Sequence, residues 1–117
     1  MKVFLVEDAP LLRERLEAML NAIPGVQTVG YAAGADAAVE GILGAGPDAV
    51  VLDIQLAQGN GFDVLRALQS RAPQVAVYVL TNFATEGYRK AAERLGARGF
   101  FDKSNDIGLL RAALSPK

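Results

Sequence analysis

The sequence contains neither cysteine nor histidine, and both absences restrict its chemistry. Without cysteine there is no disulfide, no thiol nucleophile and no cysteine-ligated zinc site. Without histidine the chain cannot be a histidine-dependent hydrolase, nor can it carry a phosphohistidine. No apolar run approaches the ~20 residues that a membrane-spanning helix needs. We therefore expect a cytoplasmic protein from a reducing compartment that makes no membrane contact.

An excess of charge of one sign is also missing, because 12 basic residues nearly balance 13 acidic ones and leave a net charge of −1. This balance gives no bulk attraction to nucleic acid or to an anionic membrane. One local basic run has no interleaved aromatic residues and consists of Arg89, Lys90, Arg94 and Arg98. We interpret it as a solvated helix face and expect no direct nucleic-acid binding.

Hydrophobic residues make up 51% of the 117 positions, which excludes disorder and suits one domain spanning residues 1–117. Short apolar runs predict strands at 3–6, 27–32, 49–52, 75–80 and 99–101. Each run is followed by apolar residues at helical spacing. The fourth helix is the weakest, and we expect it from about Thr85, its N-cap, to Leu95. Five strand–helix pairs predict an α/β fold in which helices cover both faces of a parallel sheet.

Polar residues stand where the chain leaves these predicted strands. Glu7 and Asp8 follow the first strand, Asp53 follows the third, Thr81 follows the fourth and Lys103 follows the fifth. The carboxyl ends of parallel strands meet at one edge of the sheet, where ligands gather. We therefore expect three carboxylates, one hydroxyl and one ammonium to lie in a single pocket.

Three neighbouring carboxylates repel one another, so they persist together only where a cation binds them. A hard, oxygen-preferring ion such as Mg²⁺, or Mn²⁺ in its place, suits this set of ligands. The nearby ammonium and hydroxyl suit the oxygens of a phosphoryl group. The pattern therefore predicts a phosphoryl-transfer site.

Four segments in this order resemble the receiver (CheY-like) domain of bacterial two-component response regulators over nearly the whole chain. They are V-E-D after the first strand, V-L-D-I after the third, V-L-T ending the fourth and F-F-D-K-S at the fifth. The resemblance implies a flavodoxin-like (βα)₅ three-layer sandwich with the strand order 2-1-3-4-5. The F-F-D-K-S segment also resembles receivers of helix-turn-helix (LuxR/NarL-type) regulators.

The resemblance also implies how the phosphoryl group is handled. Asp53 would accept it as a nucleophile, Lys103 would neutralise its oxygens, and the Thr81 hydroxyl would bond it once it is present. Phe100 would be the switch aromatic that moves together with Thr81. The donor would be a phosphohistidine on a sensor histidine kinase or a histidine phosphotransfer protein. The face formed by the fourth helix, fifth strand and fifth helix would bind an output partner or a second copy.

A metal site is implied in the same way. Asp8, Asp53 and the backbone carbonyl of Gln55 would ligate Mg²⁺ (or Mn²⁺), and Glu7 would act through water.

At two positions the chain departs from the family pattern. Ala57 stands in the loop after Asp53 where proline is usual, and Ser104 stands where a proline, often cis, usually follows the lysine. A cis bond before a residue other than proline costs about 2.5–4 kcal/mol, which leaves the isomer of this bond open.

The same residues argue against two other functions. A flavin carrier needs a phosphate-binding loop after the first strand, and Glu7 and Asp8 would repel that phosphate. A haloacid-dehalogenase-type phosphatase would need its nucleophile after the first strand and a second Asp two residues on, and Asp53-Ile-Gln has neither. A phosphorylation-independent interaction module stays open as the alternative. We expect no enzyme beyond Mg²⁺-dependent self-phosphorylation from small donors and slow autodephosphorylation.

Overall fold

The computed structural model describes residues 1–116. In chain order its elements are β1 (Lys2–Val6), α1 (Pro10–Asn21), β2 (Gln27–Ala32), α2 (Ala35–Ala45), β3 (Ala49–Leu52), α3 (Gly61–Arg71), β4 (Ala76–Thr81), α4 (Glu86–Arg94), β5 (Gly99–Asp102) and α5 (Ile107–Leu114). All five strands pair in parallel in one sheet of order β2-β1-β3-β4-β5. The predicted α/β fold and strand order are therefore confirmed.

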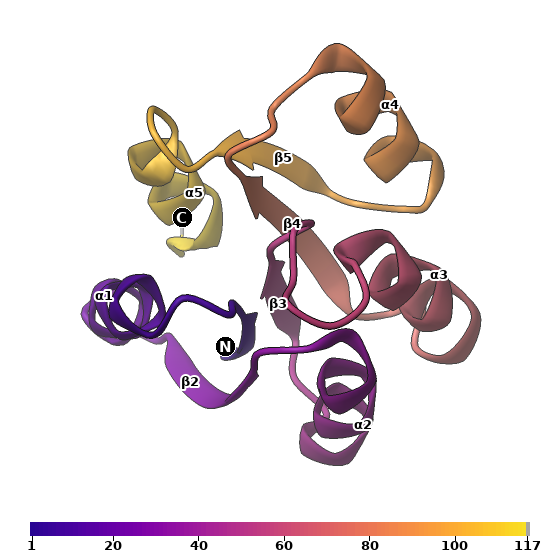
Figure 1. Ribbon diagram of the computed structural model, residues 1–117. Helices are drawn as coiled ribbons and strands as arrows, with labels where there is room; N and C mark the ends of the chain where they lie inside the picture. Colours follow the sequence, from indigo (N-terminus) through magenta and orange to yellow (C-terminus); the bar gives the residue numbers. More distant parts are fainter. Residues whose placement is uncertain (117) are drawn as a thin grey trace.

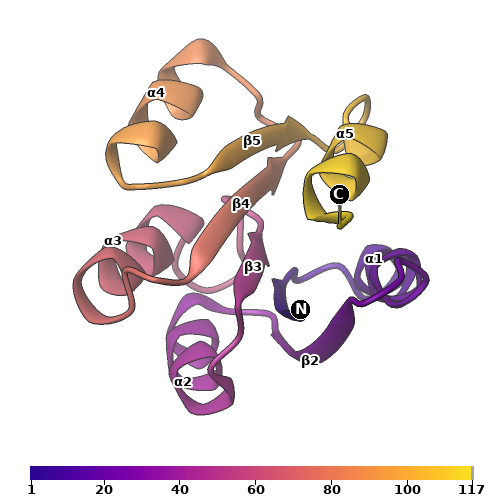
Figure 2. The same ribbon diagram turned by 180° about the vertical axis from the view of Figure 1, so that it is seen from behind.

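Helices lie on both faces of this sheet, with α1 and α5 on one face and α2, α3 and α4 on the other (Figure 1). The view from behind shows the same three layers, with α4 beside the edge strand β5 (Figure 2). The core is divided accordingly. Val3 and Leu5 of β1 pack with α1 and α5, whereas Phe4 and Val6 pack with the helices opposite. Central strands covered on both faces need continuous apolar sequences, which is why these short runs predicted them.

Four strand boundaries, in β1, β4 and β5, differ by one residue from the sequence-based prediction. At β4 the difference is a shift, because the Val75 N–H donates to the Ala72 carbonyl at 3.1 Å and so belongs to the turn after α3. At the other end of β4, Thr81 pairs with Asp102 and lengthens both β4 and β5. Thr81 is therefore the last strand residue rather than the first loop residue, which fixes its backbone in the ladder.

Helix α4 begins as the sequence predicted. The Thr85 side chain accepts a hydrogen bond from the Tyr88 N–H at 3.2 Å and caps the first turn. Within α4 only Ala92 is buried, so the helix presents little apolar surface to the sheet. Among the helices of residues 1–116, none is both long and apolar enough to cross a bilayer.

Candidate functional site

The carboxyl ends of β1 and β3 bring the predicted acids together. The Asp53 N–H donates to the Val6 carbonyl at 3.0 Å, which fixes the start of the loop after β3 against the end of β1. Glu7, Asp8 and Asp53 each offer a carboxylate oxygen, and these three oxygens lie within 4.8 Å of one another. Glu7 and Asp53 are buried, and Asp8 is half-buried. The three acids thus form one cluster, as the sequence indicated.

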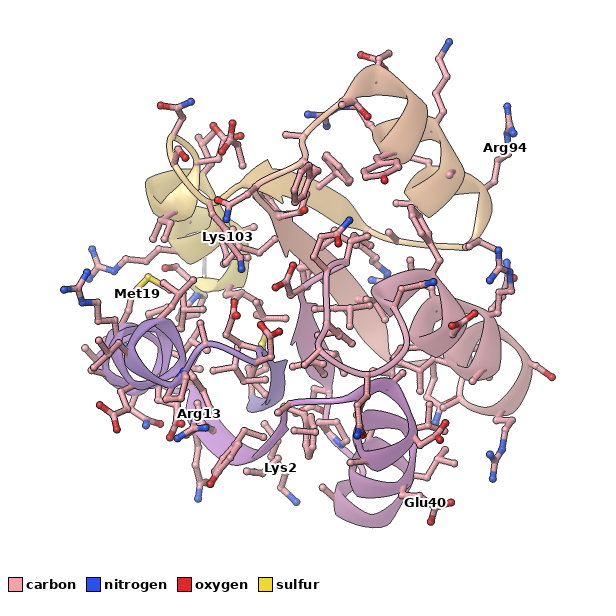
Figure 3. All side chains as sticks on the ribbon, viewed as in Figure 1. Lys2, Arg13, Met19, Glu40, Arg94 and Lys103 are labelled. Atoms are coloured by element: carbon pink, nitrogen blue, oxygen red, sulfur yellow. The ribbon has the colours of Figure 1, made fainter. Side chains whose placement is uncertain are left out.

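Lys103 joins this cluster through two ion pairs. Its Nζ lies 2.7 Å from Glu7 Oε1 and 2.8 Å from Asp53 Oδ2. All three side chains are withdrawn from water, with 9% of Lys103, 2% of Glu7 and 4% of Asp53 exposed. The Lys103 N–H donates to the Thr81 carbonyl at 3.0 Å, so the end of β4 positions the lysine backbone. Figure 3 labels Lys103, which reaches inward from the loop after β5. Its peptide bond to Ser104 is trans.

Burial is the largest single influence on the pKa of each of the three side chains, but it does not set the direction for all of them. Burial raises the pKa of the Asp53 carboxyl and that of the Glu7 carboxyl above their usual values, although hydrogen bonds from Lys103 act in the opposite direction. Burial also acts to lower the pKa of Lys103. Its hydrogen bonds to Asp53 and Glu7 outweigh that effect and raise the pKa of the ammonium above its usual value. Lys103 is therefore a fixed positive charge at neutral pH.

Both oxygens of Glu7 already have partners. Oε1 pairs with Lys103, and Oε2 accepts a hydrogen bond from the Ala9 N–H at 3.1 Å. The carboxylate of Asp53 is similarly engaged, because Oδ1 accepts from the Gln55 N–H at 3.1 Å and Oδ2 accepts from Lys103. Asp8 is the most exposed of the three acids and faces the pocket from the loop before α1. The carboxylate oxygens of Glu7, Asp8 and Asp53 together suit a hard divalent cation.

The loop after Asp53 is held by a close backbone approach. The Gly61 N–H donates to the Ile54 carbonyl at 2.8 Å, and Gln55 forms an isolated bridge with Asn60. A Cβ on Gly61 would collide with the backbone carbonyl of Asp53. Only glycine fits there, so Gly61 is a positioning residue that the sequence analysis did not single out. The glycine-rich composition of the loop was the only available signal. The role of the Gln55 carbonyl as a metal ligand stays a prediction.

Thr81 is fully buried at the end of β4. Its Oγ1 accepts a hydrogen bond from the Phe83 N–H at 3.0 Å, which leaves the hydroxyl hydrogen available to donate. Phe100 is also buried, with 6% of its surface exposed, and it belongs to the core on the α2–α3–α4 side of the sheet. Phe100 pairs with Val79 in the β4–β5 ladder, two residues before Thr81.

One residue of α4 departs from the sequence-based interpretation, and its neighbour makes a contact that the sequence did not indicate. The basic run was expected to be a solvated face, and Lys90, Arg94 and Arg98 are indeed exposed. Arg89 instead is half-buried, with Cζ 4.9 Å from the centre of the Phe100 ring. Tyr88 packs edge-on against Phe62 of α3, with the ring centroids 5.6 Å apart. Neither contact has a sequence signature, because the rotation of α4 about its axis depends on packing.

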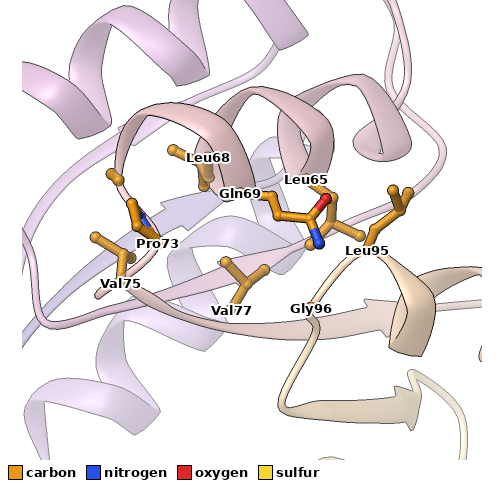
Figure 4. Close-up of a pocket in the computed structure, with 9 residues that line it drawn as sticks. Leu65, Leu68, Gln69, Pro73, Val75, Val77, Leu95 and Gly96 are labelled. Carbon is orange, nitrogen blue, oxygen red and sulfur yellow. The ribbon is translucent and has the colours of Figure 1, made fainter.

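A separate cavity lies away from the acids. It has a volume of about 60 Å³ and lies between α3, the first half of β4 and the residues after α4 (Figure 4). Val75, Val77 and Leu95 are among its lining residues, and none of the acids contributes to it. The cavity therefore lies at the start of β4, whereas Thr81 and the lysine that contacts the acids lie at its end.

Comparisons with known proteins agree with this geometry. Residues 3–115 match the family model of the response regulator receiver domain. The chain is 36% identical over 102 residues to the DNA-binding transcriptional activator DevR/DosR of Mycobacterium tuberculosis, an alignment that covers 87% of this chain and 47% of that protein. It is 33% identical over 116 residues to protein-glutamate methylesterase/protein-glutamine glutaminase 5 of Anaeromyxobacter dehalogenans, covering 88% of this chain and 32% of that protein.

Among solved structures, the BeF3-activated N-terminal receiver domain of Klebsiella pneumoniae RstA superposes with a TM-score of 0.87. The two are 27% identical, and the match covers 97% of this chain and 95% of that chain. The chain spans about half or less of the length of the two curated relatives, so their activities as whole proteins do not transfer with the match. Because the family model covers almost all of the sequence, the chain belongs to the receiver domain family of response regulators.

Proposed function

We propose that this receiver domain is a phosphorylation-operated switch of a two-component system and that Asp53 is its phosphoacceptor. The observation that supports this most directly is the position of the Asp53 carboxylate. It is buried at the end of β3, within 4.8 Å of two further acids and 2.8 Å from the Lys103 ammonium. A carboxylate that only capped a loop would need neither the acids nor the buried cation beside it.

The transfer step needs little from the protein except position and charge. An oxygen of Asp53 attacks phosphorus and forms an acyl phosphate. The bond from phosphorus to the imidazole nitrogen of the donor breaks, and its electron pair leaves with the imidazole. Lys103 stays within reach of the phosphoryl oxygens, and the Thr81 hydroxyl donates to one of them. No general base is required, because the nucleophile is an ionised carboxylate.

The acids would hold Mg²⁺, or Mn²⁺, through Asp8, Asp53 and the backbone carbonyl of Gln55. Glu7 would act through a water molecule, as the resemblance to receiver domains implies. When bound, the cation supplies positive charge that offsets the oxygens of the phosphoryl group. Receiver domains in general bind Mg²⁺, and the carboxylates present here suit a hard cation.

The phosphoryl donor we propose is a sensor histidine kinase or a histidine phosphotransfer protein in the cytoplasm. The output surface we propose is the α4–β5–α5 face, where Lys90, Arg94 and Arg98 are exposed and a partner or a second copy can dock. The domain itself would not bind DNA. DNA binding would belong to a separate effector domain in a longer protein, since the mycobacterial relative, of which this chain spans 47%, is named a DNA-binding transcriptional activator.

Incubation with Mg²⁺ and acetyl phosphate tests the phosphoacceptor. One phosphoryl group should attach to Asp53, visible as a mass increase that base and hydroxylamine remove. Asp53→Asn should abolish the label and keep the fold, because asparagine has a similar shape but is no nucleophile. Stable labelling of a serine, threonine or tyrosine would contradict the mechanism. A folded protein that takes no label from any donor would favour the phosphorylation-independent interaction module.

A further inference from the structure

Helix α4 is attached to the rest of the domain by a few side chains rather than by a broad apolar face. Ala92 is its only buried residue. Two consecutive residues provide contacts in opposite directions, because Tyr88 packs against Phe62 of α3 while Arg89 packs against Phe100 of β5. Both views of the ribbon place α4 beside β5 and α3, at the edge of the sheet (Figures 1 and 2). Arg89 is therefore one of the few side chains that connect α4 to β5.

Arg89 contacts Phe100 in two ways. Its Cζ lies 4.9 Å from the centre of the ring, and its Nη1 donates a hydrogen bond to the Phe100 carbonyl at 3.4 Å. A cation over an aromatic ring is attracted by the negative face of the ring, and half-burial reduces screening by water. The planar guanidinium can stack and donate at the same time, whereas a lysine ammonium at this position cannot.

Phe100 is linked to the phosphoryl pocket through its own strand. It pairs with Val79, Asp102 pairs with Thr81, and Lys103 follows directly. A change at Phe100 thus reaches both phosphoryl-binding side chains through one short ladder. Arg89, β5 and the pocket form a continuous chain of contacts.

We propose that Arg89 holds the Phe100 ring in its buried position and thereby couples helix α4 to the phosphoryl pocket. This inference rests on the proposed function, because the pocket must bind a phosphoryl group for the coupling to operate. When Thr81 moves toward such a group, the space behind its strand end is filled by the buried ring. A residue that stabilises the buried ring must then strengthen phosphoryl binding, since coupling between two sites is reciprocal.

Binding of beryllofluoride (BeF₃⁻) with Mg²⁺ measures this coupling without covalent chemistry. Arg89→Ala should weaken BeF₃⁻ binding by about 2- to 10-fold, the range that a half-buried cation–aromatic contact supports. The BeF₃⁻ affinity of Arg89→Lys should lie between those of the wild type and Arg89→Ala, because lysine keeps the charge but lacks the planar guanidinium. Arg71→Ala is the control, since Arg71 is an exposed arginine of α3 outside the proposed output surface, and it should bind BeF₃⁻ like the wild type.

Phe100→Leu provides the decisive comparison. In that background Arg89→Ala should cause no further loss of BeF₃⁻ affinity, because the ring it contacts is gone. In the wild-type background, without any phosphoryl mimic, Arg89→Ala should also shift the ring NMR signals of Phe100, while Arg71→Ala should leave them in place. Melting curves of all variants identify any that fail to fold, in which case Arg89→Lys supplies the measurement.

An equal or higher BeF₃⁻ affinity in Arg89→Ala, or an equal loss in the Phe100→Leu background, would overturn the inference. Unmoved ring signals would overturn it as well, whatever the BeF₃⁻ result. The proposed function fails separately, if the wild-type protein binds no BeF₃⁻ at Asp53.

Discussion

Lys103 and Asp53 lie 50 positions apart in the chain, yet the lysine Nζ donates to Asp53 Oδ2 at 2.8 Å inside the pocket. The same ammonium contacts Glu7 at 2.7 Å. One buried cation is therefore shared between two buried carboxylates. Removing one member of a buried ion pair strongly destabilises the folded protein, because the remaining charge stays buried without a partner.

Replacement of Lys103 should consequently reduce stability. We expect Lys103→Met to lower the free energy of unfolding by about 2–5 kcal/mol at neutral pH without Mg²⁺. Urea denaturation measures the loss, and added Mg²⁺ should recover part of it by supplying the missing positive charge. Lys90→Met is the control, since Lys90 is exposed on α4, and it should change stability by less than ~0.5 kcal/mol. A loss for Lys103→Met as small as that of the control would show that the ion pairs do not stabilise the fold.

Asp8 should have the opposite effect, because it adds negative charge to the cluster. Asp8→Asn should raise the melting temperature without Mg²⁺ by about 2–5 °C and reduce the further gain that Mg²⁺ gives. Asp53→Asn should raise it less, since that change also removes one partner of Lys103. The measurement is thermal unfolding followed by circular dichroism, with and without Mg²⁺. A lower melting temperature in Asp8→Asn would identify Asp8 as a structural cap.

Gly61 should tolerate no side chain. A Cβ there collides with the backbone of Asp53 and Ile54, so Gly61→Ala should lower the free energy of unfolding by about 1–3 kcal/mol and displace the phosphoacceptor. Acetyl phosphate labelling should slow accordingly in the fraction that stays folded. Gly44→Ala is the matched control, because a Cβ at that helical position meets no atom within 4 Å. It should stabilise the protein by about 0.5–1 kcal/mol. Equal behaviour of the two variants would contradict the close approach.

Phosphoryl binding should be detected beyond the pocket. On addition of BeF₃⁻ and Mg²⁺, changes in amide hydrogen exchange should extend over residues 81–105, because Thr81 and Phe100 connect the pocket to α4 and β5. Helix α4 should respond most, since it buries only Ala92. Exchange measured in Asp53→Asn under the same conditions is the control. Changes limited to the residues around Asp8 and Asp53 would show that the site binds the group without transmitting a signal to this face.

Much of the fold and of the site could be predicted from short-range patterns in the sequence. Continuous apolar runs such as Val3–Val6 fit only strands covered on both faces, and five of them separated by helical periodicity leave few topologies. The fold also explains why the site was predictable. Strand direction alone places Glu7, Asp8, Asp53 and Thr81 at one edge of the sheet, whatever the details of packing.

Contacts that depend on packing between distant residues could not be predicted from these patterns. The sequence could not show that Lys103 is shared by Glu7 and Asp53, because that depends on side-chain reach across three strand ends. It placed Arg89 on a solvated face, whereas the rotation of α4 turns this residue onto Phe100. Periodicity specifies which face of an element is apolar, and that information is local. The rotation and spacing of neighbouring elements are set by contacts between distant residues, so only the tertiary structure determined which charges meet.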